Sequence, residues 1–177
     1  MTRLTNNGKS LQFGGKTVSM PPAYDDWFLP SRDELSTMKN NVETEAGLAF
    51  GIYWASTESN ANDAIFLSSG SGSGNPKTNV YKVRPCRQFN APIGTYSIKD
   101  QGPAGGWIFF TNDTLYMEAA PNDLDASIWS NISNSLVGGT GLVIGDGITN
   151  TQLIINQVGH ISSAAKLCDD LVVFGSL

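Results

Sequence analysis

The chain has 177 residues, 40% of them hydrophobic and 10% aromatic, which suffices for the core of one domain. Its formal net charge of −5 and its pI near 4.7 argue against a nucleic-acid partner, because phosphate backbones are bound by clustered Lys and Arg. No stretch approaches the roughly 18 apolar residues of a membrane span, and the start of the chain lacks the apolar run of a secretory signal. We therefore expect a globular protein that is made in the cytoplasm, or cut from a longer precursor, and that does not insert into a membrane.

Residues 1–22 contain two short strand-like stretches with turn signals at Asn7-Gly8 and Gly14-Gly15, a pattern typical of tight hairpins. An isolated hairpin buries little apolar surface, so this hairpin arm is expected to be marginal unless it packs on the main domain or on a neighbouring subunit. The pair Pro21-Pro22 marks its end, and residues 23–177 are expected to form a single domain.

A helix is predicted over residues 32–43, directly after a short apolar strand at 27–29. Ser31 and Glu34 have the spacing of a capping box, in which each residue satisfies a backbone amide near the other. The apolar residues that follow recur at the helical period and fall on one face, which predicts that this face packs on the core.

The next part of the chain, up to residue 89, is predicted to be β structure. Strands are expected at 52–55, 63–67 and 80–84, separated by polar turns. The stretch 68–79 is rich in Gly, Ser and Asn, which is typical of a flexible linker or of a long loop. Because strands are expected on both sides of it, we interpret it as a long hairpin loop.

After a linker at 91–95, a second hairpin is predicted from strands at 107–110 and 115–118. The glycine-rich stretch 138–147 is expected to be irregular. Two helices should follow, the first capped by Thr149 or Asn150 and closed by Gly159, the second starting at Ser162 or Ser163 and running to residue 171. A final strand is expected at 172–174.

Residues that could support catalysis or metal binding are few. His160 is the single histidine of the chain, which excludes a multi-histidine metal site and leaves no evident catalytic triad. Cys86 and Cys168 are expected to be buried thiols that act as small hydrophobic side chains, and one disulfide between them is the alternative. The acidic pairs 25–26 and 169–170 are interpreted as ends of elements, because Ca²⁺ needs six or more oxygens. We expect a non-enzymatic protein without cofactor or metal.

Five sequence blocks together resemble a known family. They are YDDWFLPSRDEL (24–35), YWASTE (53–58), YKVRPCRQF (81–89), GPAGGWIFFTNDTLYMEAAP (102–121) and AAKLCDDLVVFGS (164–176). Their combination is similar to the DUF1566 domain, a C-type-lectin-like family akin to the C-terminal domain of the Legionella collagen-like protein and to the variable proteins of diversity-generating retroelements. The resemblance implies an α+β, C-type-lectin-like fold with small antiparallel sheets, about three helices and long loops.

The order of the blocks is rotated relative to that family. Residues 96–177 match the front half of the family pattern and residues 24–90 match its back half. Circular permutation is tolerated where the ends of a domain lie close together, so we expect one permuted domain. The alternative is an exchange in which the half at 96–177 completes the other half of a neighbouring chain, giving a ring or a filament.

In this family the stretch between the YWASTE-like and VRPCR-like blocks resembles a diversified binding face, which implies that residues 59–79 form the ligand-facing surface. Short polar side chains there supply adaptable hydrogen bonds. The candidate ligand-binding residues are Ser59, Asn60, Asn62, Asp63, Ser69, Ser71, Ser73, Asn75 and Asn79. The candidate structural residues are Trp27, Trp54, Glu58, Arg84, Arg87 and Trp107. For Arg84 we predict a carboxylate partner such as Glu58 or Asp33.

The resemblance favours a non-enzymatic phage virion or cell-surface structural protein, with a lectin-like domain used for adhesion or decoration. The expected partners are other virion or surface subunits, including further copies of the chain, and a host glycan or receptor. The alternative function is a carbohydrate- or protein-receptor-binding module that acts through residues 59–79. A formylglycine-generating type of enzyme is the least favoured interpretation, because the two cysteines do not reproduce its motif.

Overall fold

The computed structural model describes residues 10–13, 15–48, 50–68 and 72–175, and this part of the chain has a mixed α+β fold. The elements in chain order are β1 (Ser10–Phe13), β2 (Lys16–Ser19), β3 (Ala23–Tyr24), α1 (Arg32–Val42), β4 (Tyr53–Glu58), β5 (Asp63–Leu67), β6 (Gly72–Pro76), β7 (Val80–Val83), β8 (Cys86–Asn90), β9 (Trp107–Asn112), β10 (Leu115–Ala119), β11 (Leu124–Ile128), α2 (Asp146–Ile155), α3 (Ala164–Asp169) and β12 (Val173–Phe174). Within these ranges, no helix has both the length and the apolar character needed to cross a bilayer.

The largest sheet has five strands in the order β11-β7-β4-β5-β6, and β4 lies at its centre. Its neighbour β7 runs parallel to β4, whereas the other strand pairs are antiparallel. The expectation of antiparallel sheets is therefore wrong at this pair. The expectation of a long loop at 68–79 is also wrong, because residues 72–76 form β6 and pair with all of β5.

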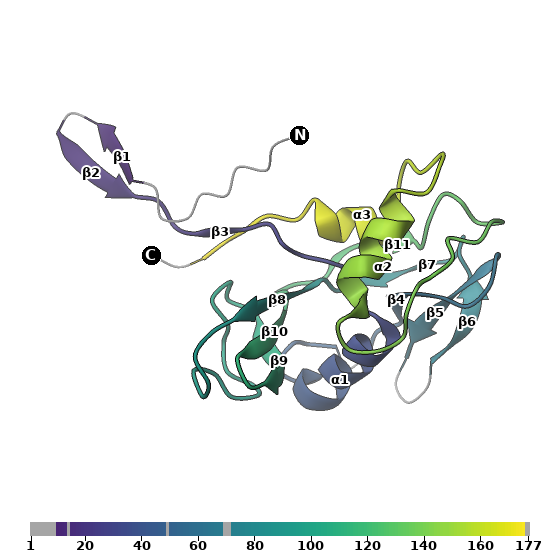
Figure 1. Ribbon diagram of the computed structural model, residues 1–177, viewed down its shortest axis with the longest axis horizontal. Coiled ribbons are helices and arrows are strands. Elements are labelled where there is room, and N and C mark those ends of the chain that lie inside the picture. The colour runs from purple at the N-terminus through teal and green to yellow at the C-terminus, as the bar shows by residue number, and fades with distance from the viewer. Residues whose placement is uncertain (1–9, 14, 49, 69–71, 176–177) are drawn as a thin grey trace.

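The three-stranded sheet, in the order β8-β10-β9, joins the two halves of the chain. Strand β8 comes from the half at 24–90, and it pairs along its full length with β10 from the half at 96–177. The larger sheet is also shared, because β11 pairs with β7. Figure 1 shows the two sheets on opposite sides of the body, with α1 below them and α2 crossing in front. Both halves of one chain thus contribute to a common interior.

The two ends of this body also meet within one chain. In the ribbon formed by β3 and β12, Val173 pairs with Tyr24 and Phe174 with Ala23, and the amide of Gly175 donates to the carbonyl of Pro22 (2.8 Å). This antiparallel arrangement brings residue 175 next to residue 22, where a short turn could connect them. Ser176, at the end of the last sequence block, lies outside the described residues, whereas the preceding residue Gly175 makes this hydrogen bond to Pro22. Among the described residues, each half of the chain thus supplies strand partners for the other half.

Local signals predicted helices α1 and α3 well. The capping box of α1 is present, with the Ser31 side chain accepting from the Glu34 amide and the Glu34 side chain accepting from the Ser31 amide. Ser163 caps α3 by accepting from the amide of Lys166. Helix α2 begins at Asp146 after Gly145, which has a φ of +103°. The predicted caps Thr149 and Asn150 are therefore wrong, and both residues lie inside the helix.

The hairpin of β9 and β10 is confirmed, and Asp113 takes the left-handed conformation in its turn (φ +52°). Cys86 and Cys168 are both free and fully buried, so the prediction of two buried thiols is confirmed. Burial raises the pKa of each thiol well above its ordinary value.

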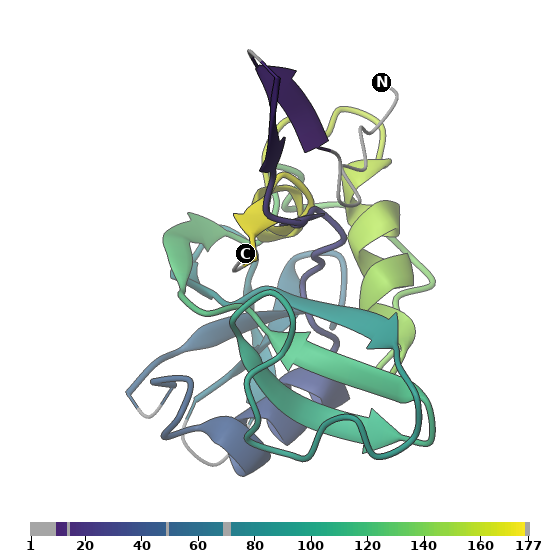
Figure 2. The same cartoon turned by 90° about the vertical axis from the view of Figure 1, so that its left-hand side faces the viewer.

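The hairpin arm contains the antiparallel pair β1–β2, and Gly15 lies in a turn between the two strands. The turn expected at Asn7-Gly8 lies outside the described residues. Figures 1 and 2 both show the β1–β2 hairpin projecting beyond the body, on the side where β3 and β12 meet. A two-stranded hairpin that projects in this way gains little stability from packing.

Candidate functional site

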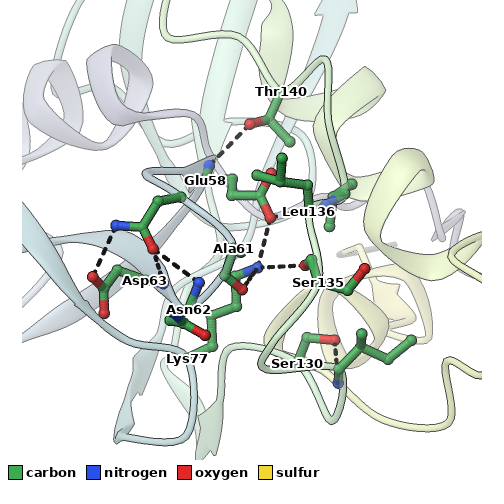
Figure 3. Close-up of polar contacts among 12 residues, drawn as sticks. Glu58, Ala61, Asn62, Asp63, Lys77, Ser130, Ser135, Leu136 and Thr140 are labelled. Atoms are coloured by element: carbon green, nitrogen blue, oxygen red, sulfur yellow. Dashed lines mark hydrogen bonds and ion pairs between the residues drawn. The ribbon is translucent and has the colours of Figure 1, made fainter.

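The region predicted to bind a ligand is organised around a buried ion pair at its base. The Nζ atom of Lys77 lies 2.6 Å from Oε1 of Glu58, and the two side chains are only 0% and 5% exposed. Lys77 also donates to the carbonyls of Ala61 (2.9 Å) and Ser135 (3.0 Å), so all three of its ammonium hydrogens have acceptors. Figure 3 shows these contacts converging on Lys77 from three segments.

Trp129 covers the buried ammonium group. Its ring centroid lies 5.0 Å from Nζ of Lys77, a distance at which the ring face attracts a cation. The indole itself is fixed, because its Nε1 donates to the carbonyl of Ala55 in β4 (2.8 Å). The backbone joins the same residues, since the amide of Trp129 donates to the carbonyl of Lys77 (2.9 Å). The ring of Trp129, the carboxylate of Glu58 and the two carbonyl acceptors together enclose the ammonium group of Lys77.

Glu58 ties a second loop to the same point. Its carboxylate accepts from the amides of Val137 (2.9 Å) and Gly138 (3.1 Å), and its own amide donates to Oγ1 of Thr140 (3.0 Å). Both carboxylate oxygens are therefore used, one by Lys77 and Val137 and the other by Gly138. The pair Glu58–Lys77 consequently fixes the hairpin of β5 and β6 and the loop 135–140 to the end of β4.

Several predicted ligand residues are engaged in a tight turn between β4 and β5. The side-chain oxygen of Asn60 accepts from the amides of Asn62 (2.8 Å) and Asp63 (3.0 Å), and its Nδ2 donates to Asp63 (2.9 Å). Asn60 and Asp63 therefore shape the turn itself. Ser59 and Asn62 are exposed beside them.

The other predicted ligand residues lie on β6 and on the turn that follows it. Asn75 and Asn79 both donate to the hydroxyl of Tyr81, whose ring packs on Trp54 at 4.6 Å between centroids. Ser73 is exposed on β6, whereas Ser69 and Ser71 lie outside the described residues. The face defined by Ser59, Asn62 and Ser73, which we call the hairpin face, is thus presented on a rigid base.

The arginines of the VRPCR block have other partners than predicted. Nε of Arg84 lies 2.7 Å from Oδ1 of Asp123, and its NH1 donates to the carbonyl of Ala120 (2.9 Å). The predicted partners were wrong because each is occupied elsewhere: Glu58 pairs with Lys77, and Asp33 pairs with Arg32 at the start of α1 (2.8 Å).

Arg87 forms the second buried charge cluster. Its guanidinium binds both oxygens of Asp26 (2.7 and 2.9 Å) and donates to Glu118 (3.2 Å). It also lies over the rings of Tyr24 (4.5 Å) and Phe89 (5.0 Å). This bidentate, stacked geometry is one that arginine provides and lysine does not. Arg87 thereby joins β8 to the region where the ends of the body meet.

Glu118 explains the glycines of the GPAGGW block. It is fully buried, and its carboxylate accepts from the amides of Ala104 (3.1 Å) and Gly106 (2.8 Å). A Cβ atom at Gly102 would lie 2.4 Å from Cδ of Glu118, so a side chain there would displace the carboxylate. Burial raises the pKa of Glu118, against the opposing effects of the Gly106 amide and Arg87.

The three tryptophans predicted to be structural lie in different parts of the core. Trp27 and Trp54 are buried, and Trp107 is half-buried against the cluster that contains Phe109 and Met117. Lys77 and Trp129 were missed by the sequence reasoning. The available signal was a single lysine within a Gly-, Ser- and Asn-rich stretch.

His160 is placed where it supports structure. Its Nε2 lies 2.8 Å from Oγ of Ser163, the buried cap of α3. Desolvation lowers the pKa of His160, and Lys166 adds to the effect. Among the described residues, no three His, Cys, Asp or Glu side chains are grouped so that they could hold a metal ion.

Comparison with known proteins gives no relative from which to transfer a function. No protein-family model matches the sequence, and neither the curated proteins nor the solved structures contain a significant match. The functional argument therefore depends on the residues and the geometry described above.

Proposed function

We propose that this chain is a non-enzymatic structural protein of a phage virion or a cell surface, with a lectin-like, circularly permuted domain used for adhesion or decoration. The observation that carries the proposal is the buried pair Glu58–Lys77, which fixes the segments that present the exposed, polar hairpin face to the core. A face that is ordered before binding loses less conformational entropy when it meets a partner.

Two further features support a structural role. The Arg87 cluster and the β3–β12 ribbon hold the two ends of the body together. The hairpin arm joins the body at this ribbon, directly before β3. The β1–β2 hairpin and the β5–β6 hairpin lie on different sides of the molecule (Figure 1). One of them can thus contact a target while the other contacts neighbouring subunits.

The location of the protein tests this proposal. Antibodies raised against the folded protein should label the outside of intact phage particles or of intact cells, and the labelling should be lost when the gene is deleted. Protein found only in the soluble fraction of lysed cells, with no labelling of particles or cell surfaces, would contradict the proposal.

A second candidate function is a carbohydrate- or protein-receptor-binding module that acts through residues 59–79. Exposed Ser59, Asn62 and Ser73 beside a fixed turn favour it, because such side chains supply adaptable hydrogen bonds. A glycan array probed with the wild type and with N62R/S73R tests this function. Binding that the substitutions abolish would support it, and an array without binding by an assembled protein would favour the purely structural role.

A further inference from the structure

Strand β6 forms one edge of the five-stranded sheet, and Figure 1 shows it at the outer margin of that sheet. It pairs with β5 on one side, and among the described residues no strand pairs with its other side. Proteins usually protect such an edge with a lysine, a bulge or a covering segment, because unpaired backbone groups can pair with another chain. The five residues of β6 include no charged side chain, and their register with β5 is unbroken.

The register of this hairpin determines which backbone groups of β6 point outward. The amide of Lys77, the residue after β6, donates to the carbonyl of Asn62 on the β5 side (2.9 Å). Because the backbone groups of successive residues in a strand point to opposite edges, those of Asn75 also point to β5 and those of Gly74 point away from it. Gly74 therefore offers one N–H donor and one C=O acceptor at the open edge of the sheet.

The open edge is short and is held in place before any contact. Pro76 ends it, since proline has no N–H and its carbonyl already accepts from the amide of Asn79 in the next turn (2.9 Å). The next residue, Lys77, is fixed by its buried pair with Glu58. A strand that is ordered in this way loses less conformational entropy when it pairs.

The side chains on either side of Gly74 are complementary to each other. When two copies of β6 pair antiparallel with their Gly74 residues opposite, Ser73 of each copy lies opposite Asn75 of the other. The two Gly74 residues then exchange both backbone hydrogen bonds, and Ser73 and Asn75 form the closer, non-hydrogen-bonded pairs.

These facing side chains supply a donor and an acceptor. Asn75 uses its Nδ2 to donate to Tyr81, and within the described part of the chain neither its Oδ1 nor the hydroxyl of Ser73 has a partner. A serine hydroxyl can donate to an amide oxygen, and such cross-strand pairs stabilise a sheet. The edge is therefore complementary to a second copy of itself.

Charge does not oppose this contact. The chain has a formal net charge of −5, so two copies repel each other where their acidic surfaces meet. Strand β6 has no charge, and Asp63, the charged residue of β5, lies opposite Pro76 at one end of the hairpin. The open edge is thus a surface at which two copies can meet without like charges directly opposite each other.

We propose that β6 pairs antiparallel with β6 of a second copy of this chain, so that the five-stranded sheets of the two copies form one continuous sheet. Because both copies use the same strand, the contact is isologous and closes at a dimer. Ser73 and Asn75, which the sequence predicted to bind a ligand, are thereby assigned to the contact between subunits. The inference rests on the proposed role as a structural subunit and names its partner.

Sedimentation of the purified full-length protein over a range of concentrations tests the inference. The wild type is expected to show a monomer–dimer equilibrium that added salt does not weaken, because the contact carries no ion pair. G74P removes the outward N–H and should weaken the dimer at least tenfold, whereas proline at an outward-facing edge position is compatible with the fold. The matched control G74A keeps the N–H and should still form the dimer.

The two substitutions share one steric effect. Each places a Cβ atom 2.8 Å from Oγ of Ser59, an exposed side chain that can move aside. The comparison of G74P with G74A therefore isolates the lost backbone donor, and thermal melts of both variants verify that they fold.

Cysteine cross-linking identifies the strand and its register. Mild oxidation of a mixture of S73C and N75C should give a disulfide-linked heterodimer. Either variant alone should link much less, because identical positions are diagonal in this register and lie beyond the roughly 7 Å between Cα atoms that a disulfide spans. The native cysteines Cys86 and Cys168 are buried and do not compete.

Three results would overturn the inference. They are a wild type that stays monomeric at every concentration, as expected if β6 instead receives an extended segment of another protein, a dimer that G74P leaves intact, and linkage of S73C alone as efficient as that of the mixture. A dimer that is sensitive to G74P, found together with no labelling of particles or cell surfaces, would instead count against the proposed location, so the two failures are distinguishable.

Discussion

Two of the buried cations, Lys77 and Arg87, each join separate segments of the chain, but their surroundings differ. Lys77 is sealed together with its partner, since neither it nor Glu58 is more than 5% exposed. Arg87 is also buried, yet one of its partners, Asp26, has a side chain that is 46% exposed. The carboxylate of Glu58 is thus stabilised by protein groups alone, whereas the carboxylate of Asp26 can also be hydrated.

This difference predicts how each region fails. Removing one member of a sealed pair leaves an uncompensated charge in the interior, and the cost is large. Removing Arg87 leaves Asp26 free to hydrate, so only Glu118 remains buried without its cation. The first loss should release the hairpin face, and the second should loosen the junction of the chain ends.

Substitution K77M is expected to have the largest effect. It leaves Glu58 buried without a cation, at a cost of about 3–5 kcal/mol in the free energy of unfolding. Chemical denaturation measures this change. Two controls sharpen it: K82M, at a lysine that is 46% exposed, should cost less than about 1 kcal/mol, and E58Q/K77M should recover part of the loss. Equal destabilisation by K77M and K82M would contradict the account.

Substitution R87M should have the next largest effect. It removes charged hydrogen bonds to Asp26 and Glu118, and we expect a cost of about 2–3 kcal/mol because Asp26 can be rehydrated. The same denaturation experiment measures it. R87K should remain well below wild type in stability, since lysine cannot make the bidentate contact. Full recovery with R87K would show that only the charge matters.

The buried carboxylate of Glu34 should give a smaller effect that depends on pH. Desolvation raises the pKa of Glu34, although the amides of Ser31 and Gly145 oppose the shift. Between the ordinary glutamate pKa and this raised value, the folded state binds more protons than the unfolded state. Stability that is present at the acid end is therefore lost as pH rises through this window.

The comparison of wild type with E34Q isolates this contribution. The difference in the free energy of unfolding, wild type minus E34Q, should fall as pH rises through the window and become constant above it. A difference that grows with pH would mean that the pKa of Glu34 is lowered in the folded state.

The smallest effects are expected on the hairpin face. S59A and S73A should each change stability by less than about 0.5 kcal/mol, because both side chains are exposed. N60A should cost more, about 1 kcal/mol, since Asn60 holds two backbone amides of the turn. Thermal melts of the three variants measure the ranking. Large losses at Ser59 or Ser73 would mean that this face is part of the scaffold.

Local sequence signals predicted the local structure. The capping box at Ser31, the cap at Ser163 and the β9–β10 hairpin each depend on residues within a few positions of one another. The rotated order of the sequence blocks predicted that both halves of the chain share one domain, but not that β8 pairs with β10. The buried state of Cys86 and Cys168 followed from their apolar neighbours.

The features that were missed depend on residues far apart in the sequence. Strand β6 forms in a Gly- and Ser-rich stretch because β5 offers it a full set of backbone partners. Helix α2 starts early because Glu34, more than a hundred residues away, accepts from the amide of Gly145. The ion pair Glu58–Lys77 needs Trp129 and the loop 135–140 to close it. No local pattern encodes such a convergence.

Hydrogen exchange at the amides of Val137 and Gly138 tests the central claim most directly, because both donate to the carboxylate of Glu58. In the wild type these amides should exchange as slowly as those of β4, and in K77M they should exchange much faster while the amides of β8 and β10 stay protected. Fast exchange at Val137 and Gly138 in the wild type, or exchange that K77M leaves unchanged, would contradict the claim that this ion pair holds the hairpin face in place.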